Sequence, residues 1–153
     1  MLWISQNRHG QTEPESEGIL VVEDNHLNQR MMMLMLKHVG LRCDLVNNGL
    51  ESLEALNRRA YGLVLMDIDM PILNGLDAAR RIRSDKSLKQ PNIIAVTAST
   101  VSEKTCREAG MDGIMTKPLK VQLLKELLFR LNFLSEGGES NELNRVDPCR
   151  YAL

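Results

Sequence analysis

Short apolar runs alternate with longer amphipathic segments along most of this chain. The runs are short and lack polar alternation, which is typical of strands buried on both faces of a parallel sheet. They predict strands at residues 19–22, 41–46, 63–66, 93–96 and 114–115. The amphipathic segments predict helices at 26–39, 49–59, 75–84, 101–109 and 119–133, and glycines stand where helix C-caps belong, at Gly40 and Gly110. Five strand and helix repeats predict a doubly wound α/β fold with right-handed crossovers.

The first predicted helix is rich in methionine, and two interpretations fit this composition. A Met-rich surface can form an adaptable binding groove. Alternatively, its apolar residues pack against the sheet, and helical spacing favours this second interpretation. The residues at that spacing are Leu27, Met31, Leu34, Met35 and His38.

The two ends of the chain are more polar than the part between them. Residues 1–17 carry polar and acidic residues with little periodicity and predict a flexible tail or linker. Residues 18–134 predict one domain, and the polar, glycine-containing residues 135–153 predict a second flexible tail. A length of 153 residues, of which 43% are apolar and 25% charged, agrees with a single globular domain that has a core.

Charge and hydropathy argue against several classes of function. The formal net charge of −1 gives no electrostatic support for direct nucleic acid binding, and we interpret Arg80, Arg81 and Arg83 as a solvated helix face. No apolar stretch approaches the roughly 20 residues of a membrane-spanning helix, and the amino terminus lacks a signal-peptide pattern, so we expect a cytoplasmic setting. The cysteines and histidines show no ligand spacing, so oxygen ligands should hold any metal.

Charged and hydroxyl side chains follow four of the predicted strands. Glu23 and Asp24 follow the first strand, Asp67 the third, Thr97 the fourth and Lys117 the fifth. Each has an ordinary structural explanation when taken alone, such as helix capping by an acidic pair. Together they stand at the carboxyl ends of the strands, where open α/β sheets bind their ligands. Three neighbouring carboxylates favour Mg²⁺, and a lysine beside them suits a phosphoryl group.

Four segments of the sequence resemble the receiver domain of two-component response regulators. The matching segments are ILVVEDN at 19–25, LVLMDIDMPILNG at 63–75, IIAVTA at 93–98 and KP at 117–118. The phrases VEDNHLNQ and MDIDMPILNGLDAARRIR are most similar to receivers attached to hybrid sensor histidine kinases. The resemblance covers about residues 18–133 and implies a flavodoxin-like (βα)5 fold. Its sheet would have five parallel strands in the order 2-1-3-4-5, with helices on both faces.

The resemblance gives each residue at the strand ends a role. It implies that Asp67 accepts a phosphoryl group from the phosphohistidine of a partner, while Thr97 and Lys117 act on that group. It implies an Mg²⁺ ion, for which Mn²⁺ could substitute, held by Glu23, Asp24, Asp67 and the backbone carbonyl of Asp69. It also implies a cis peptide before Pro118, because only bonds to proline take the cis form cheaply.

The resemblance further implies how the domain meets other proteins. The donor would be a histidine kinase or a histidine-containing phosphotransfer protein, docking on a surface that includes Asn25, Asn28, Pro71 and Pro118. A dimer would use the face formed by the fourth helix, fifth strand and fifth helix. Ile114 stands where many receivers carry an aromatic switch residue, so we expect altered coupling to this face. Both a stand-alone receiver and a segment of a hybrid kinase fit the sequence.

Two other classes of protein share parts of this pattern. A phosphohydrolase of the haloacid-dehalogenase type also has an Asp-x-Asp pair like Asp67 and Asp69, but at its first strand and with its acidic pair downstream. A flavin mononucleotide binder shares the topology but needs glycine- and hydroxyl-rich loops where this chain has carboxylates. The sequence therefore favours a receiver that catalyses only its own phosphorylation and dephosphorylation. In such a receiver, Asp69 and Ser99 would flank the path of the water that attacks the phosphoryl group during dephosphorylation.

Overall fold

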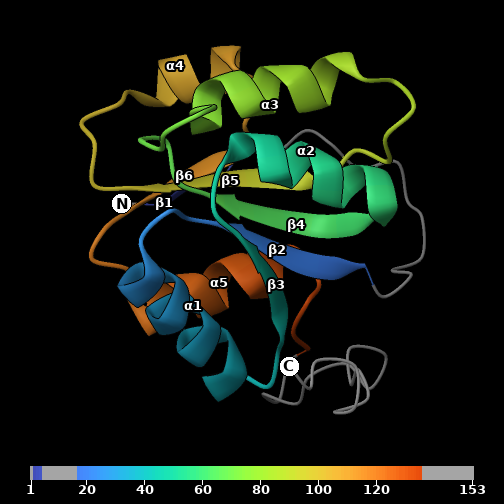
Figure 1. Ribbon diagram of the computed structural model, residues 1–153. Helices are drawn as coiled ribbons and strands as arrows, with labels where there is room; N and C mark the ends of the chain where they lie inside the picture. The colour runs from blue at the N-terminus through green and yellow to red at the C-terminus, as the bar shows by residue number, and fades with distance from the viewer. Residues whose placement is uncertain (1, 5–16, 136–153) are drawn as a thin grey trace.

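A six-stranded sheet lies between two layers of helices in the computed structural model, which describes residues 2–4 and 17–135 (Figure 1). The strands are β1 (Leu2–Ile4), β2 (Gly18–Val22), β3 (Cys43–Val46), β4 (Tyr61–Met66), β5 (Asn92–Thr97) and β6 (Gly113–Thr116). The helices are α1 (His26–His38), α2 (Gly49–Arg58), α3 (Gly75–Ser84), α4 (Glu103–Glu108) and α5 (Val121–Arg130). Helices α2, α3 and α4 cover one face of the sheet, and α1 and α5 cover the other (Figure 1).

The order of the strands is β1-β6-β5-β4-β2-β3, and all neighbours except β1 and β6 are parallel. Without β1, the remaining five strands have the predicted order, 2-1-3-4-5, so the predicted fold is confirmed. The order of the strands reverses between β2 and β4. In a sheet of this kind, the crevice for a ligand lies at this point, outside the carboxyl ends of the strands.

Side chains from both faces of the sheet are buried, as the apolar runs predict. In β2, Leu20 and Val22 pack into the core on the α2 and α3 side, whereas Ile19 and Val21 pack into the core on the α1 and α5 side. This alternation follows from the period of two in a strand. Within the part of the chain that the structure describes, no helix has both the length and the apolar character to cross a membrane.

Residues 2–4 correct the prediction that residues 1–17 form a flexible tail. They form β1, which pairs antiparallel with β6 and places Trp3 in register with Ile114. Three residues are too few to show a periodicity, and their pairing depends on the backbone of a strand distant in the sequence. Residues 5–16 of the predicted first tail, and 136–153 of the second, lie outside the described residues.

The orientation of α1 corrects a second prediction. Four residues of the predicted core face are exposed instead, and they are Leu27 (68%), Met31 (48%), Leu34 (52%) and His38. The residues that α1 buries are Gln29, Met32 and Leu36, and Met35 is half-buried. Because apolar residues occur on most sides of this helix, their spacing does not select the buried side. The result is an exposed apolar stripe of Leu27, Met31 and Leu34, which we call the α1 stripe.

Arg83 corrects a third prediction, that of a solvated arginine cluster. Its side chain is only 13% exposed, and its Nη2 lies 2.7 Å from Asp112 Oδ2. Arg83 Nε also donates to the carbonyl oxygen of Gly110 at 2.7 Å, and its Nη1 donates to that of Pro91 at 2.9 Å. This arginine therefore ties α3 to the segments that precede β5 and β6. Arg80, with a side chain 51% exposed, fits the original interpretation.

Candidate functional site

The residues predicted at the strand ends extend the hydrogen bonding of the sheet. Glu23 N donates to Val46 O at 3.1 Å, and Asp67 N donates to Val22 O at 2.9 Å. In the same way, Lys117 N donates to Thr97 O at 2.9 Å. The backbone of each residue is therefore held by a neighbouring strand. A site built on such rigid elements positions its side chains more precisely than one built on free loops.

The loop between β2 and α1 holds Glu23 in place. Asn25 is the N-cap of α1, and its side chain accepts from Asn28 N at 3.0 Å. Asn25 N also donates to Glu23 Oε1 at 3.1 Å, and the buried Gln29 side chain donates to Glu23 O. Gln29 further donates to Asn47 Oδ1 at 2.9 Å, which joins the loops after β2 and β3. The sequence analysis missed Gln29, although an amide at a buried helix position is a usable signal.

An ammonium group lies between two of the predicted carboxylates. Lys117 Nζ donates to Glu23 Oε2 at 2.6 Å and to Asp67 Oδ2 at 3.3 Å. Burial raises the pKa of Glu23 above its ordinary value, although the hydrogen bond from Lys117 opposes this. Burial alone would lower the pKa of Lys117, but the bond to Glu23 and the charge of Asp67 outweigh it and raise that pKa. Lys117 thus stays charged because of its two acidic neighbours.

Three carboxylates meet around this lysine. Glu23, Asp24 and Asp67 each offer an oxygen, and these oxygens all lie within 4.8 Å of one another. Lys117 is the cation that the structure shows bonded to this group, so the negative charge is only partly balanced. An all-oxygen donor set with unbalanced negative charge fits a hard cation such as Mg²⁺. The residues therefore suit the ion that the sequence analysis expected.

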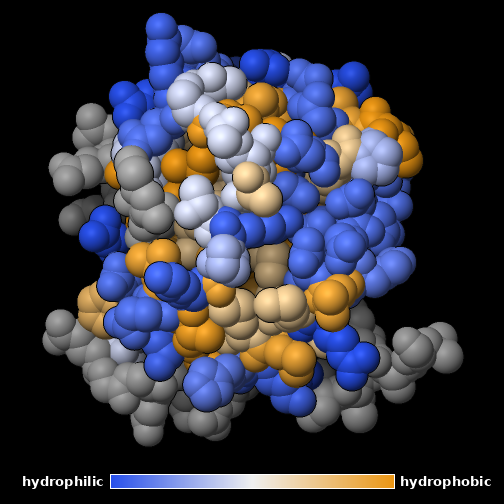
Figure 2. Space-filling model, turned by 90° about the vertical axis from the view of Figure 1, so that its left-hand side faces the viewer, coloured by the Kyte–Doolittle hydropathy of each residue, from blue (hydrophilic) through white to orange (hydrophobic). Residues whose placement is uncertain are grey.

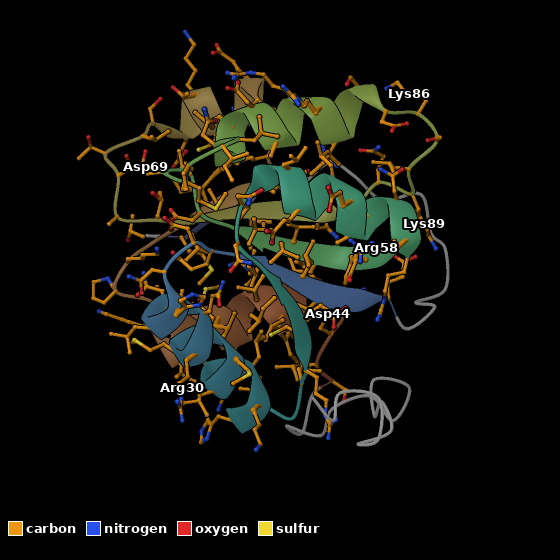
Figure 3. All side chains as sticks on the ribbon, viewed as in Figure 1. Arg30, Asp44, Arg58, Asp69, Lys86 and Lys89 are labelled. Carbon is orange, nitrogen blue, oxygen red and sulfur yellow. The ribbon has the colours of Figure 1, made fainter. Side chains whose placement is uncertain are left out.

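The turn after β4 separates the two aspartates of the Asp-x-Asp pair. Asp67 is 7% exposed and its Oδ1 accepts from Ile68 N at 2.7 Å, whereas Asp69 is exposed. Asp69 lies at the end of the sheet remote from Arg58, Lys86 and Lys89 (Figure 3). Gly75 N donates to Ile68 O at 2.9 Å, and a Cβ at Gly75 would overlap the carbonyl oxygen of Asp67. Glycine at this position lets the turn close tightly behind Asp67.

Thr97 and the segment after Lys117 complete the set of predicted residues. Thr97 is fully buried at the end of β5, and its Oγ1 accepts from Ser99 N at 3.0 Å. The peptide bond between Lys117 and Pro118 is cis, which confirms that prediction. Ile114 is buried beneath α4 in the core and has Trp3 as its register partner in β1.

The residues predicted for partner contact lie around this site. Asn25, Pro71 and Pro118 are exposed, and Asn28 is half-buried. Ile72, next to Pro71, is 77% exposed and has a φ of 71°, which is rare for a β-branched residue. Figure 2, which views the molecule from the left of Figure 1, shows hydrophobic residues below a hydrophilic centre, on the side of α1 and α5. Polar and apolar surfaces therefore adjoin at this end of the molecule.

Comparisons with known proteins give the following matches. Residues 19–129 match the family model described as the response regulator receiver domain. Histidine kinase 5 of Arabidopsis thaliana is 36% identical over 144 residues, which cover 76% of this chain and 16% of that protein. The chain thus spans about a sixth of the length of this relative.

Two solved structures share the fold. The receiver domain of sensor histidine kinase PA1611 from Pseudomonas aeruginosa, which holds a magnesium ion in its active-site cleft, is 36% identical with a TM-score of 0.68. The match covers 75% of this chain and 96% of that one. A chain of the Saccharomyces cerevisiae complex between the phosphotransfer protein Ypd1 and the receiver domain of Ssk1 is 26% identical with a TM-score of 0.67. That match covers 75% of this chain and 88% of the other.

Proposed function

Because this chain belongs to the response regulator receiver domain family, we propose that it takes a phosphoryl group onto Asp67 from a phosphohistidine of a partner protein. The observation that carries this proposal is the ammonium of Lys117, held between Glu23 and Asp67 at the carboxyl end of the sheet. Asp67 is the member of the Asp-x-Asp pair that contacts this lysine. We also propose that the transfer takes place in the cytoplasm.

The chain's own residues account for the transfer. A carboxylate oxygen of Asp67 attacks phosphorus, the bond between phosphorus and the imidazole nitrogen breaks, and its electron pair stays on the imidazole, which takes up a proton. Ile68 N, bonded to Asp67 Oδ1, fixes the orientation of the nucleophile. Lys117 pairs with the phosphoryl oxygens, and the hydroxyl of Thr97 donates to one of them.

The proposed ion site uses residues that already lie together. Glu23, Asp24 and Asp67 would hold Mg²⁺, or Mn²⁺ in its place, with the backbone carbonyl of Asp69 as a further ligand and Glu23 acting mostly through water. When bound, the ion supplies positive charge that offsets the carboxylates and the incoming phosphoryl group. The exposed Asp69 and the nearby Ser99 would flank the water that later removes the phosphoryl group, so they tune the rate of dephosphorylation.

Labelling by a small phosphodonor tests the acceptor. We expect Mg²⁺-dependent incorporation of phosphate, located at Asp67 by mass spectrometry and abolished by a chelator. Asp67→Asn should remove the label completely, because the amide is a very poor nucleophile. Asp77→Asn is the matched control, since it makes the same substitution at an exposed aspartate of α3 outside the carboxylate group and should keep the label. Equal labelling of the Asp67→Asn variant would show that another residue accepts the phosphate.

We further propose that the phosphohistidine donor docks over Asn25, Asn28, Pro71 and Pro118, with the α1 stripe beside them. A charge in the centre of an apolar contact typically costs more than about 1 kcal/mol of binding. Leu27→Glu should therefore reduce transfer from a phosphorylated phosphotransfer protein such as Ypd1 by about tenfold. Labelling by the small phosphodonor should not change, because Leu27 is 68% exposed and lies outside the carboxylate group.

The matched control for docking is Leu50→Glu, which places the same charge on α2, where Leu50 is 43% exposed. Helix α2 covers the opposite face of the sheet from α1 (Figure 1). Transfer from the protein donor should be nearly unchanged in this variant. If Leu27→Glu lowered labelling by both donors equally, the α1 stripe would affect the chemistry and not the docking.

A further inference from the structure

The edge of β6 carries a strand that fits it closely. In β1, Leu2 is in register with Met115, Trp3 with Ile114 and Ile4 with Gly113. Trp3 packs against the core on the α2, α3 and α4 side, and Ile4 packs against the core on the α1 and α5 side. An extended segment with an aromatic residue at its centre thus closes both sides of the sheet edge. Without it, the backbone groups at the edge of β6 would be open to pairing.

Glycine in β6 makes this close approach possible. A Cβ at Gly113 would overlap the carbonyl oxygen of Trp3. It would also come within 2.8 Å of Ile94 Cδ1, which is the movable end of a side chain. The backbone contact, by contrast, could be relieved only by moving β1 away. A glycine inside a strand is typical of a place where another backbone comes close.

Helix α4 holds the other side of Trp3. The guanidinium carbon of Arg107 lies 4.5 Å from the centroid of the Trp3 ring, which is the geometry of a cation–π contact. Helix α4 has six residues and buries only Cys106 among them, so few contacts fix its position. Its position depends on the connection from β5, which begins at Thr97 and is held by the bond from Ser99 N to Thr97 Oγ1.

We propose that the edge of β6 and Arg107 of α4 form a docking surface for β1, and that phosphorylation of Asp67 loosens β1 from it. This inference rests on the proposed function of Asp67. The Thr97 side chain rotates to bring its hydroxyl to the phosphoryl group, and its displaced Oγ1 then no longer accepts from Ser99 N. The connection from β5 then shifts α4, and Arg107 moves away from Trp3. In the unphosphorylated chain β1 covers the edge of the face formed by α4, β6 and α5, so pairing with another protein at that edge requires β1 to leave.

Tryptophan fluorescence of the full chain tests this inference, because Trp3 is its only tryptophan. The indole is half-buried, so acrylamide should quench it less in the unphosphorylated protein than it quenches a fully exposed indole. Mg²⁺ and a small phosphodonor should raise the quenching constant by about twofold or more as the ring becomes exposed. The Asp67→Asn variant under the same conditions should not respond. Intact mass measured on the same samples gives the fraction that is phosphorylated.

Two surface variants of α4 test the contact without any phosphodonor. Arg107→Ala removes the cation over Trp3 and should raise the quenching constant, whereas Lys104→Ala, also exposed on α4, should not. Equal quenching in the two variants would overturn the inference. So would complete phosphorylation with unchanged Trp3 quenching, and in that case the proposed function would stand. Absence of phosphate on Asp67 would overturn the proposed function and the inference together.

Discussion

Arg83→Met should lower the free energy of unfolding by about 3 to 5 kcal/mol, which is the range for breaking a buried ion pair by removing one partner. The Arg83 side chain is 13% exposed and its partner Asp112 is 7% exposed. Methionine keeps the unbranched apolar stem but lacks the guanidinium, so the carbonyl oxygens of Gly110 and Pro91 would each lose the bond from Arg83. Urea denaturation followed by circular dichroism measures the change.

Arg80→Met is the matched control, because it makes the same substitution one turn earlier on the same helix. The side chains of Arg80 and its partner Asp77 are 51% and 48% exposed, and surface pairs contribute about 0 to 1 kcal/mol. Both variants should still be labelled on Asp67 under conditions where they are folded, since neither arginine belongs to the carboxylate group. If the two variants lost equal stability, the tie that Arg83 makes between α3 and the segments before β5 and β6 would be energetically unimportant.

The fold and the main site were predictable because both follow from patterns repeated along the chain. Each buried parallel strand is recognisable as an apolar run, and four of the five runs are followed within two residues by a predicted site residue. Glu23, Asp67 and Lys117 could therefore be placed near one another before any contact was known. The structure brings these three together, with Asp24 beside them, and it separates Asp69 from the group by the turn after β4.

The features that the sequence did not reveal depend on contacts between distant segments. The buried side of α1 is decided by Gln29, Met32 and Leu36 meeting the sheet, while equally apolar neighbours remain exposed. Arg83 looks like its neighbours in the sequence until the carbonyl oxygens of other loops surround it. Neither the choice of the buried side of α1 nor the burial of Arg83 alters the local hydrophobic pattern. The periodicity of that pattern could therefore predict neither of them.

The contact between β1 and β6 at Trp3 and Ile114 is a third feature that depends on distant segments. The sequence predicted altered coupling at Ile114, where many receivers carry an aromatic residue, and the structure shows that Ile114 is buried. The structure places an aromatic ring on the same face, contributed by β1 through its register with β6. Because the ring belongs to another strand, it can leave the face without a change at Ile114. If β1 leaves on phosphorylation as we propose, this chain loses an aromatic contact beside residue 114 although residue 114 is aliphatic.

Lys117→Met should affect both stability and phosphorylation, because this ammonium balances Glu23 and Asp67 at once. Without it, the carboxylate of Glu23, only 2% exposed, has no cation bonded to it among the residues that the structure describes. The metal-free variant should lose about 2 to 3 kcal/mol of unfolding free energy, which is less than the loss for a fully enclosed pair because the Lys117 side chain is 19% exposed. Labelling of Asp67 by a small phosphodonor should fall at least about tenfold, since no ammonium remains for the phosphoryl oxygens.

Adding Mg²⁺ should distinguish the effect of Lys117 on stability from its effect on phosphorylation. A ligand that binds only the folded state stabilises it, by about 2.7 kcal/mol at a hundred times its dissociation constant. Removing the ammonium makes the carboxylate group more negative, so Mg²⁺ should stabilise Lys117→Met more than it stabilises the native chain, while labelling stays low. Lys104→Met, which loses only a surface contact to Glu108, should respond to Mg²⁺ as the native chain does. An equal response of Lys117→Met and the native chain would mean that the ion does not bind beside Lys117, because only a cation close to the lost ammonium can compensate for it.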